Sequence, residues 1–210
     1  RGLELPSDPE KALFSILNAP ARPVDIGCVR YGGRTRRFIV SSGFGFDASV
    51  CHQVMVSRLK PLLNRLHLGK LTYAGVALQL LFFLRPQNMQ MILDGQEKIS
   101  FHGVYFAAAM NLPFEGGGFK FCPHADCRDC KLNIIVVSGL SKLKVLLLLP
   151  TAFFGLHTLF HGVHTYTCHS AEFLSAAELP VHTDGEPVLR QQRMMVRLEN
   201  EKLLMKIINK

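Results

Sequence analysis

The stretch SSGFGFDASV, residues 41–50, marks the point where an extended sequence pattern gives way to a helical one. Before it, VDIGCVRY (24–31) and RRFIVSS (36–42) flank the turn sequence GGRT, which predicts two strands joined by a hairpin. After it, helical spacing continues over roughly residues 47–84. We expect a break at Lys60–Pro61, because proline disfavours helix in the residue before it.

The pattern on either side of this stretch is mixed but mainly extended. SDPEKALFSIL (7–17) predicts a short helix with Ser7 as its N-cap, and residues 140–162 predict a helical region broken near Pro150. Asp94–Gly95 predicts a turn, and GVYFAAAMN and KLNIIVVSG read as apolar strands. After residue 162 we expect a series of short strands. The sequence therefore predicts an α+β, β-rich domain with helices inserted between strands.

The chain is basic and able to form a core. Its 210 residues are 48% hydrophobic, and its formal net charge is +8. The excess positive charge lies in three clusters: Arg30, Arg34, Arg36 and Arg37; Arg58, Lys60, Arg65 and Lys70; and Arg190, Arg193 and Arg197. Such a surface favours phosphates, acidic lipid or nucleic acid. Nucleic acid is not expected, because the chain has no Trp, only four Tyr and no basic–aromatic recognition sequence.

The cysteines and the longest apolar run indicate the cellular compartment and the relation of the chain to a membrane. Six cysteines, with no secretory apolar segment at the start, are typical of a reduced, cytoplasmic protein. The run VLLLLPTAFFGLHTLF (145–160) is shorter than the ~20 residues that span a bilayer, and Pro150 and His157 interrupt it. A helix that lies against a membrane or over a lipid pocket remains open.

FCPHADCRDC, residues 121–130, admits two metal hypotheses. Cys127 and Cys130 have the spacing of a zinc knuckle, with Cys122 and His124 nearby, but four ligands within nine residues would need an unusually tight wrap. The aspartates of the same loop offer oxygen ligands suited to Mg²⁺ or Ca²⁺.

Three further patterns are candidates with ordinary alternatives. His157, His161 and His164 are spaced to share a helix face, although the Glu of the hydrolytic zinc motif is missing. PFEGGGFKF (113–121) is Gly-rich without matching a phosphate-binding loop, and suggests a sharp loop beside a site. HTDGEPV (182–188) reads as a hairpin turn in which Asp184 and Glu186 flank Gly185, so that a general base could face a cleft.

Taken in order, these motifs resemble the diacylglycerol kinase-like lipid kinases, a family that includes bacterial diacylglycerol kinases, sphingosine kinases and ceramide kinases. The matching pieces are SSGFGFDASV, Asn111 with the glycines of 116–118, PHADCRDCKLNI (123–134), Gly155 with His157, and DGE at 184–186. Each motif alone is weak, and the ordered set over roughly residues 1–190 is specific.

The resemblance implies a protein of two domains with separate roles. Family members have an N-terminal domain with a GGDGT nucleotide loop, which this sequence lacks. Residues 1–22 would then follow that domain, and residues 23–210 would form the β-sandwich-like C-terminal domain. ATP would lie in the cleft between the halves, and this chain alone would be inactive.

The resemblance also implies roles for particular residues. Glu186 matches the proton acceptor that activates the lipid hydroxyl, with Asp184 beside it. A Mg²⁺ site would use the Asp129 side chain with the backbone carbonyls of Asp126 and Lys131. Cys130 stands where the family has Gly, so a positive φ there would be strained.

The leading hypothesis is a cytoplasmic lipid kinase that associates peripherally with an anionic membrane. It would transfer the γ-phosphate of ATP to a lipid hydroxyl, with diacylglycerol giving phosphatidic acid. Two alternatives stay open: a non-catalytic lipid- or membrane-binding module of the same fold, and a zinc-binding interaction domain. A homodimer is a further possibility for the assembly.

Overall fold

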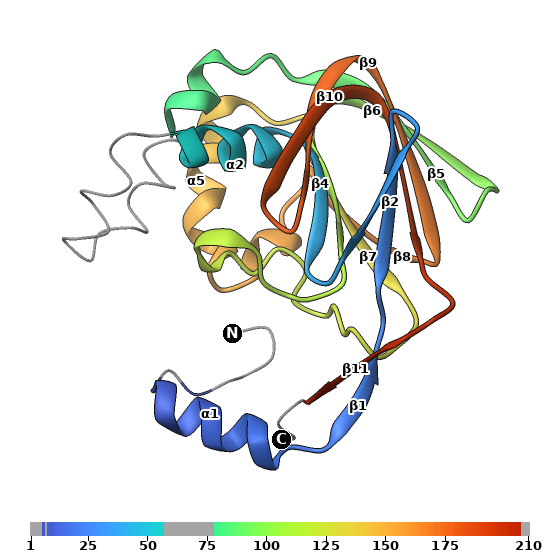
Figure 1. The fold of residues 1–210 in the computed structure, drawn as a ribbon. Helices are drawn as coiled ribbons and strands as arrows, with labels where there is room; N and C mark the ends of the chain where they lie inside the picture. The colour runs from blue at the N-terminus through green and yellow to red at the C-terminus, as the bar shows by residue number, and fades with distance from the viewer. Residues whose placement is uncertain (1–5, 7, 57–77, 207–210) are drawn as a thin grey trace.

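Long antiparallel strands dominate the molecule (Figure 1). The computed structural model describes residues 6, 8–56 and 78–206. Its elements are α1 (Pro9–Asn18), β1 (Ala21–Val24), β2 (Gly27–Tyr31), β3 (Arg34–Phe38), β4 (Ser41–Gly45), α2 (Phe46–Val56), β5 (Gln87–Leu93), β6 (Glu97–Met110), the 3₁₀ turn η1 (Gly116–Gly118), β7 (Leu132–Ser138), α5 (Lys142–Ala152), the 3₁₀ turn η2 (Leu156–Leu159), β8 (Val163–Cys168), β9 (Ser170–Thr183), β10 (Glu186–Leu198) and β11 (Leu203–Lys206).

The main sheet has nine strands. Eight of them follow the order β3-β2-β10-β9-β4-β6-β7-β8. The ninth strand, β5, pairs with β6 and β9, at the ends of these two long strands that lie away from β4. Strands β4 and β5 therefore both bridge β6 and β9, and the sheet curves round a shared interior. The predicted β-rich, sandwich-like α+β fold is confirmed.

Strand alternation divides the apolar side chains between two cores. Ala107 of β6 and Ile134 of β7 point into the interior of the sandwich with Phe44 and Phe173. Their neighbours Ala108 and Ile135 point to the opposite face, where α2 and α5 pack (Figure 1). A two-residue period explains this division, because successive side chains of a strand point to opposite faces. Both faces of β6 and β7 are thus buried, which accounts for their nearly continuous apolar sequences.

The helices differ from the sequence prediction at their ends. The N-cap of α1 is Asp8, whose carboxylate accepts the N–H of Lys11, rather than the predicted Ser7. Helix α2 and the helical residues 78–83 lie within the predicted region 47–84, and the expected break at Lys60–Pro61 falls outside the described residues.

The helical region predicted over 140–162, with a break near Pro150, corresponds to α5 and η2, and the break lies at residues 153–155. Helix α5 ends at Ala152, and Gly155 adopts φ +75°, a left-handed conformation that ends the helical path. His157 lies in η2 and His164 in β8, with His161 in the turn between them. The three histidines therefore do not share a helix face.

Some strand boundaries also differ from those predicted from the sequence. The RRFIVSS segment divides into β3 and the start of β4. Of the strands expected after residue 162, β8 and β11 are short, as predicted, whereas the other two, β9 and β10, are long. Their pairing continues through register shifts between Val188 and Arg193. The Asp94–Gly95 turn is confirmed, with both residues at positive φ. No described helix is long and apolar enough to cross a bilayer.

Candidate active site

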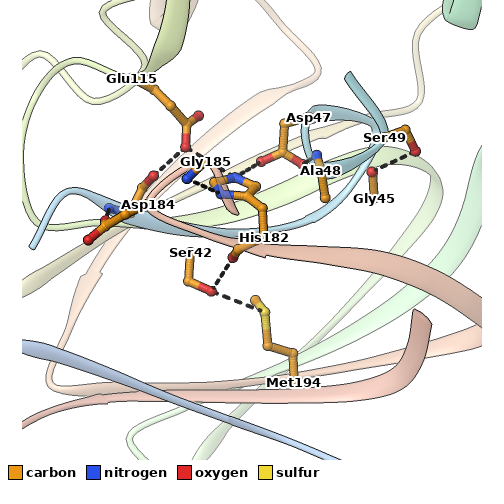
Figure 2. Close-up of polar contacts among 11 residues, drawn as sticks. Ser42, Gly45, Asp47, Ala48, Ser49, Glu115, His182, Asp184, Gly185 and Met194 are labelled. Atoms are coloured by element: carbon orange, nitrogen blue, oxygen red, sulfur yellow. Dashed lines mark hydrogen bonds and ion pairs between the residues drawn. The ribbon is translucent and has the colours of Figure 1, made fainter. Parts of the chain in front are cut away.

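A buried polar cluster joins three distant parts of the chain (Figure 2). Asp47 comes from the first turn of α2, Glu115 precedes η1, and His182 lies near the end of β9. Nε2 of His182 lies 3.0 Å from Asp47 Oδ2 and 3.1 Å from Glu115 Oε1. All three side chains are buried, and the Ser41 hydroxyl donates to Glu115 Oε1.

Gly43 of β4 makes room for this cluster. A Cβ on Gly43 would lie 1.8 Å from Asp47 Oδ2 and 2.3 Å from His182 Nε2, so any side chain would displace both groups. Gly45 is required for a different reason: its φ is +112°, and an added Cβ would lie 2.8 Å from the carbonyl oxygen of Tyr105. The two glycines of the 41–50 stretch thus serve the packing of the cluster and the turn into α2.

The buried cluster holds a proton that Asp47, Glu115 and His182 would not hold if each were alone in water. Burial raises the pKa of Asp47. Burial disfavours a charged His182, whereas the two carboxylates favour a proton beside its ring. Burial would likewise raise the pKa of Glu115, but His182 and the Ser41 hydroxyl lower it overall. Two buried carboxylates this close cannot both be ionised without a compensating proton.

A backbone contact decides how His182 is arranged. The N–H of Gly185 donates to Nδ1 of His182 over 3.2 Å, so this nitrogen is an acceptor. Nε2 then carries the hydrogen that faces Asp47 and Glu115. A metal ligand would need a lone pair on Nε2 and a hydrogen on Nδ1, facing the Gly185 N–H. The cluster therefore fits a proton network better than a metal site.

The same contact fixes the turn that carries the predicted catalytic residues. Asp184 adopts φ +51°, and its carboxylate accepts the backbone N–H groups of residues 39, 40 and 41 at 2.8–3.0 Å. Its own N–H donates to the carbonyl of Ser41. Because backbone donors already hold Asp184, its carboxylate positions the turn.

Glu186 differs from Asp184 in being accessible. Its side chain is 65% exposed, and its Oε2 lies 2.6 Å from a guanidinium nitrogen of Arg36 on β3. The hydrogen bond to Glu186 is the main cause of the raised pKa of Arg36. The turn thus offers one carboxylate fixed by backbone donors and one exposed carboxylate that is paired with Arg36.

The predicted Mg²⁺ loop is held by short-range contacts. The Asp126 carboxylate accepts from the backbone and guanidinium of Arg128, and Asp129 Oδ1 accepts the N–H of Lys131 at 2.9 Å. Cys130 adopts φ +62°, so the loop keeps a glycine-like backbone despite the substitution. A left-handed backbone is therefore present at position 130, with strain at the cysteine.

Asp25 and Lys202 support this loop from outside. The N–H of Cys130 donates to Asp25 Oδ2 at 2.8 Å, and the Lys202 ammonium lies 2.8 Å from Asp25 Oδ1 and 2.9 Å from the Cys130 sulfur. Asn111 bridges the carbonyls of Asp25 and Ile39, so the loop is linked to the backbone that holds Asp184.

The zinc hypothesis is wrong for the described residues. Cys122 and Cys127 are buried, and Cys130 is exposed. Within the described ranges, the Asp47–Glu115–His182 cluster is the single group of three or more His, Cys, Asp or Glu side chains close enough to share an ion. Burial raises the pKa of the Cys122 and Cys127 thiols, which opposes the thiolate form that zinc needs.

An apolar pocket of about 80 Å³ lies beside the cluster. Asp47 and Glu115 contribute to its wall, and Phe106, Val145 and Leu149 are among its apolar lining residues. A pocket of this volume admits only a small part of an apolar ligand, with carboxylates at its edge.

Comparison with known proteins identifies this combination of fold and motifs. The family model described as "YegS C-terminal NAD kinase beta sandwich-like domain" matches residues 39–200. The chain belongs to this family. The YegS C-terminal match includes β4, the loop of 126–131 and the Asp184–Glu186 turn, so the motifs noted in the sequence lie within it.

Relatives of this YegS-type chain carry the names of lipid kinases. It is 32% identical over 149 residues to "Putative lipid kinase YtlR" of Bacillus subtilis, covering 71% of this chain and 48% of the relative. It is 28% identical over 182 residues to a diacylglycerol kinase of Mycobacterium tuberculosis, covering 85% and 55%. The chain therefore spans about half the length of these curated relatives.

A solved structure supports the fold. The crystal structure of "a putative diacylglycerol kinase" from Bacillus anthracis superposes with a TM-score of 0.70 at 20% identity, covering 99% of this chain and 63% of that one. The predicted membership of the lipid kinase family is confirmed by the family match and the named relatives.

Sequence reasoning missed the Asp47–Glu115–His182 cluster as a unit. The signals were present, since Asp47 lies in the 41–50 stretch, Glu115 precedes three glycines and His182 stands two residues before Asp184. Nothing in the sequence brings these three positions together.

Proposed function

We propose that this chain is the lipid-binding half of an ATP-dependent lipid kinase in which the Glu186 carboxylate accepts the proton of the lipid hydroxyl. The observation that carries the proposal is the Asp184–Glu186 turn. Backbone N–H groups of residues 39–41 hold Asp184, while the Glu186 carboxylate stays accessible. Phosphoryl transfer needs mainly positioning and charge neutralisation, and a fixed turn with an exposed carboxylate oriented by Arg36 suits that requirement.

The reaction follows from this geometry. The lipid hydroxyl oxygen attacks the γ-phosphorus of ATP, its proton passes to Glu186, and the bond to ADP breaks. Arg36, 2.6 Å from Glu186, orients the carboxylate and supplies a positive charge where the phosphate approaches. ATP would be bound by a part of the protein outside this chain. The names of the relatives favour diacylglycerol as the lipid and phosphatidic acid as the product.

His182 is a positioning residue in this proposal. Its Nδ1 accepts the Gly185 N–H, and its Nε2 is held between Asp47 and Glu115. The turn is therefore fixed on one side through Asp184 and on the other through Gly185. The buried cluster anchors the base without contacting the reacting atoms.

We also propose that the 126–131 loop holds Mg²⁺. The Asp129 side chain with the backbone carbonyls of Asp126 and Lys131 would supply oxygen ligands, and the left-handed conformation of Cys130 keeps the loop shape. A bound ion would neutralise negative charge near the site. Through Asp25, Asn111 and Ile39, the loop stabilises the backbone that holds Asp184.

The test is Glu186→Gln in the complete protein that carries this chain. Loss of the proton acceptor should lower kcat for phosphorylation of diacylglycerol by roughly 10²–10⁴-fold. The matched control is Glu178→Gln, which removes an exposed carboxylate from the neighbouring strand β9 and should leave kcat near wild type.

Near wild-type turnover of Glu186→Gln would contradict the catalytic assignment. A wild-type protein that binds lipid vesicles but phosphorylates no lipid would instead support the non-catalytic module.

A further inference from the structure

Helix α5 is apolar on both sides. Val145 and Ala152 are buried against the sheet, yet Leu143 and Leu147 on other sides of the helix are 65% and 66% exposed. A surface helix of a globular protein normally turns a polar face to water. A helix that is apolar all round is normally covered by protein or by lipid.

The exposed apolar residues continue beyond α5 into its neighbours. We call this region the α5–η2 surface; it consists of Phe82, Phe83, Leu143, Leu147, Phe153, Phe154, Leu156, Leu159 and Phe160. Its parts are adjacent: the Lys142 ammonium donates to the carbonyl of Phe82, and α5 contacts η2. Nine large exposed apolar side chains gathered on two helical segments and a 3₁₀ turn mark an interaction surface rather than scattered surface residues.

The charge on this surface has one sign. Between Asp129 and Glu172 the chain contains no Asp or Glu, and α5 begins with Lys142 and Lys144. Long lysine side chains can keep their ammonium groups at lipid headgroups while apolar neighbours enter the acyl region. Apolar side chains beside cations, without carboxylates, complement an anionic lipid surface.

The arginine clusters that sequence analysis associated with a membrane are less suited to this role. Arg36 pairs with Glu186, and Arg37 and Arg197 both lie within ion-pair distance of Glu199. Arg193 pairs with Glu172. Carboxylates thus offset much of this charge, and the cluster of residues 58–70 lies outside the described residues.

The opposite side of α5 leads to the candidate site. Val145 and Leu149 line the apolar pocket whose wall includes Asp47 and Glu115. A lipid leaving a bilayer beside α5 would therefore keep its acyl chains in apolar surroundings on the way to the polar cluster. This link between surface and pocket rests on the proposed lipid kinase function.

We propose that the α5–η2 surface inserts into the interfacial region of an anionic bilayer. Phe154 and Leu159, exposed by 75% and 80%, lie among the acyl chains, and Lys142 and Lys144 contact anionic headgroups. The occupant is a lipid surface, because the cations, the absence of carboxylates between residues 129 and 172 and the adjoining apolar pocket each favour it.

Vesicle flotation of the complete protein tests the surface directly. With phosphatidylcholine vesicles containing phosphatidylserine, Phe154→Glu/Leu159→Glu should lower the partition coefficient by at least about tenfold. Both side chains are exposed, so the fold should persist, as circular dichroism would verify. Lys142→Gln/Lys144→Gln should remove roughly tenfold of the preference for phosphatidylserine over phosphatidylcholine alone.

The matched control is Phe14→Glu/Leu17→Glu on α1, a separate helix below α5 in the view whose apolar side chains are exposed and which buries none of its own residues (Figure 1). This variant should float like wild type. Unchanged flotation of the α5–η2 variant, or an equal loss for both, would overturn the proposal. So would self-association of the wild type that the α5–η2 variant abolishes.

Activity separates this proposal from the proposed function. If the α5–η2 variant phosphorylates a short-chain, monomeric diacylglycerol normally but fails on vesicles, both proposals are supported. If no lipid is phosphorylated by wild type, the kinase proposal fails, while flotation still decides whether this surface binds membranes.

Discussion

The buried Asp47–Glu115–His182 cluster and the 126–131 loop are both rich in charge but are built in opposite ways. In the cluster, His182 meets a carboxylate 135 residues away, out of contact with water. In the loop, Asp126 meets Arg128 two residues on, at the surface. Short-range pairs can be inferred from sequence but contribute little stability, whereas the buried long-range contacts cannot be inferred and are costly to break.

The largest effect should come from His182→Ala, which tests whether the cluster is as costly to break as its burial implies. Asp47 and Glu115 would face each other in the interior without their shared donor. We expect the free energy of unfolding to fall by about 3–5 kcal/mol, measured by urea denaturation. His161→Ala, at an exposed position, is the control and should change little. A loss below about 1 kcal/mol for His182→Ala would remove the contrast between the two regions.

A change in stability of intermediate size should accompany a rise in pH. Burial, together with the Glu115 charge, raises the folded-state pKa of Asp47 above its usual 3.8, so its stabilising contribution is complete below pH 3.8 and is lost as pH rises through the folded-state pKa. The melting temperature should therefore fall over this range. Glu115→Gln removes the negative charge that helps to raise this pKa and should flatten the dependence. An unchanged slope in this variant would show that the cluster does not hold the extra proton.

The smallest effect should come from the loop. Cys130→Gly relieves a left-handed non-glycine residue and should raise the free energy of unfolding by about 1 kcal/mol, measured by urea denaturation. Asp126→Asn, which weakens the exposed pair with Arg128, should change it by less than about 0.5 kcal/mol. Titration of Cys130→Gly with Mg²⁺ would sharpen the comparison, since tighter binding than in wild type is expected if the loop holds the ion. Destabilisation by Cys130→Gly would indicate that the contact of Cys130 with Lys202 outweighs the backbone strain.

Local signals predicted the turns and the fold class well. Asp94–Gly95 and Asp184–Gly185 are turns with positive φ, as their residue types indicated, and the alternating apolar strands form the β-rich fold. The predicted break near Pro150 in the helical region 140–162 lies instead at residues 153–155, because apolar spacing cannot show that Gly155 adopts a left-handed conformation. The roles of Glu186, Asp184 and the Mg²⁺ loop remain predictions.

The buried cluster could not be predicted because its specificity is three-dimensional. From the sequence, Gly43 suggests only backbone flexibility. Its importance is steric, because a Cβ at this position would lie 1.8 Å from Asp47 Oδ2. Glu115 lies in an irregular segment whose course no periodicity sets. Only the pairing of β4 with β9 brings Gly43 opposite His182 and so reveals the site.

The pairing of β1 with β11 has a mechanical consequence. These strands form a separate two-stranded sheet in which Ala21 faces Lys206, and the Lys206 ammonium also donates to the carbonyl of Leu17. Tension applied across the two ends would load this short antiparallel ladder one residue pair at a time, from Ala21–Lys206 inward. It would unzip before force reached the nine-stranded sheet, so the Asp184–Glu186 turn and the buried cluster would keep their structure under moderate tension.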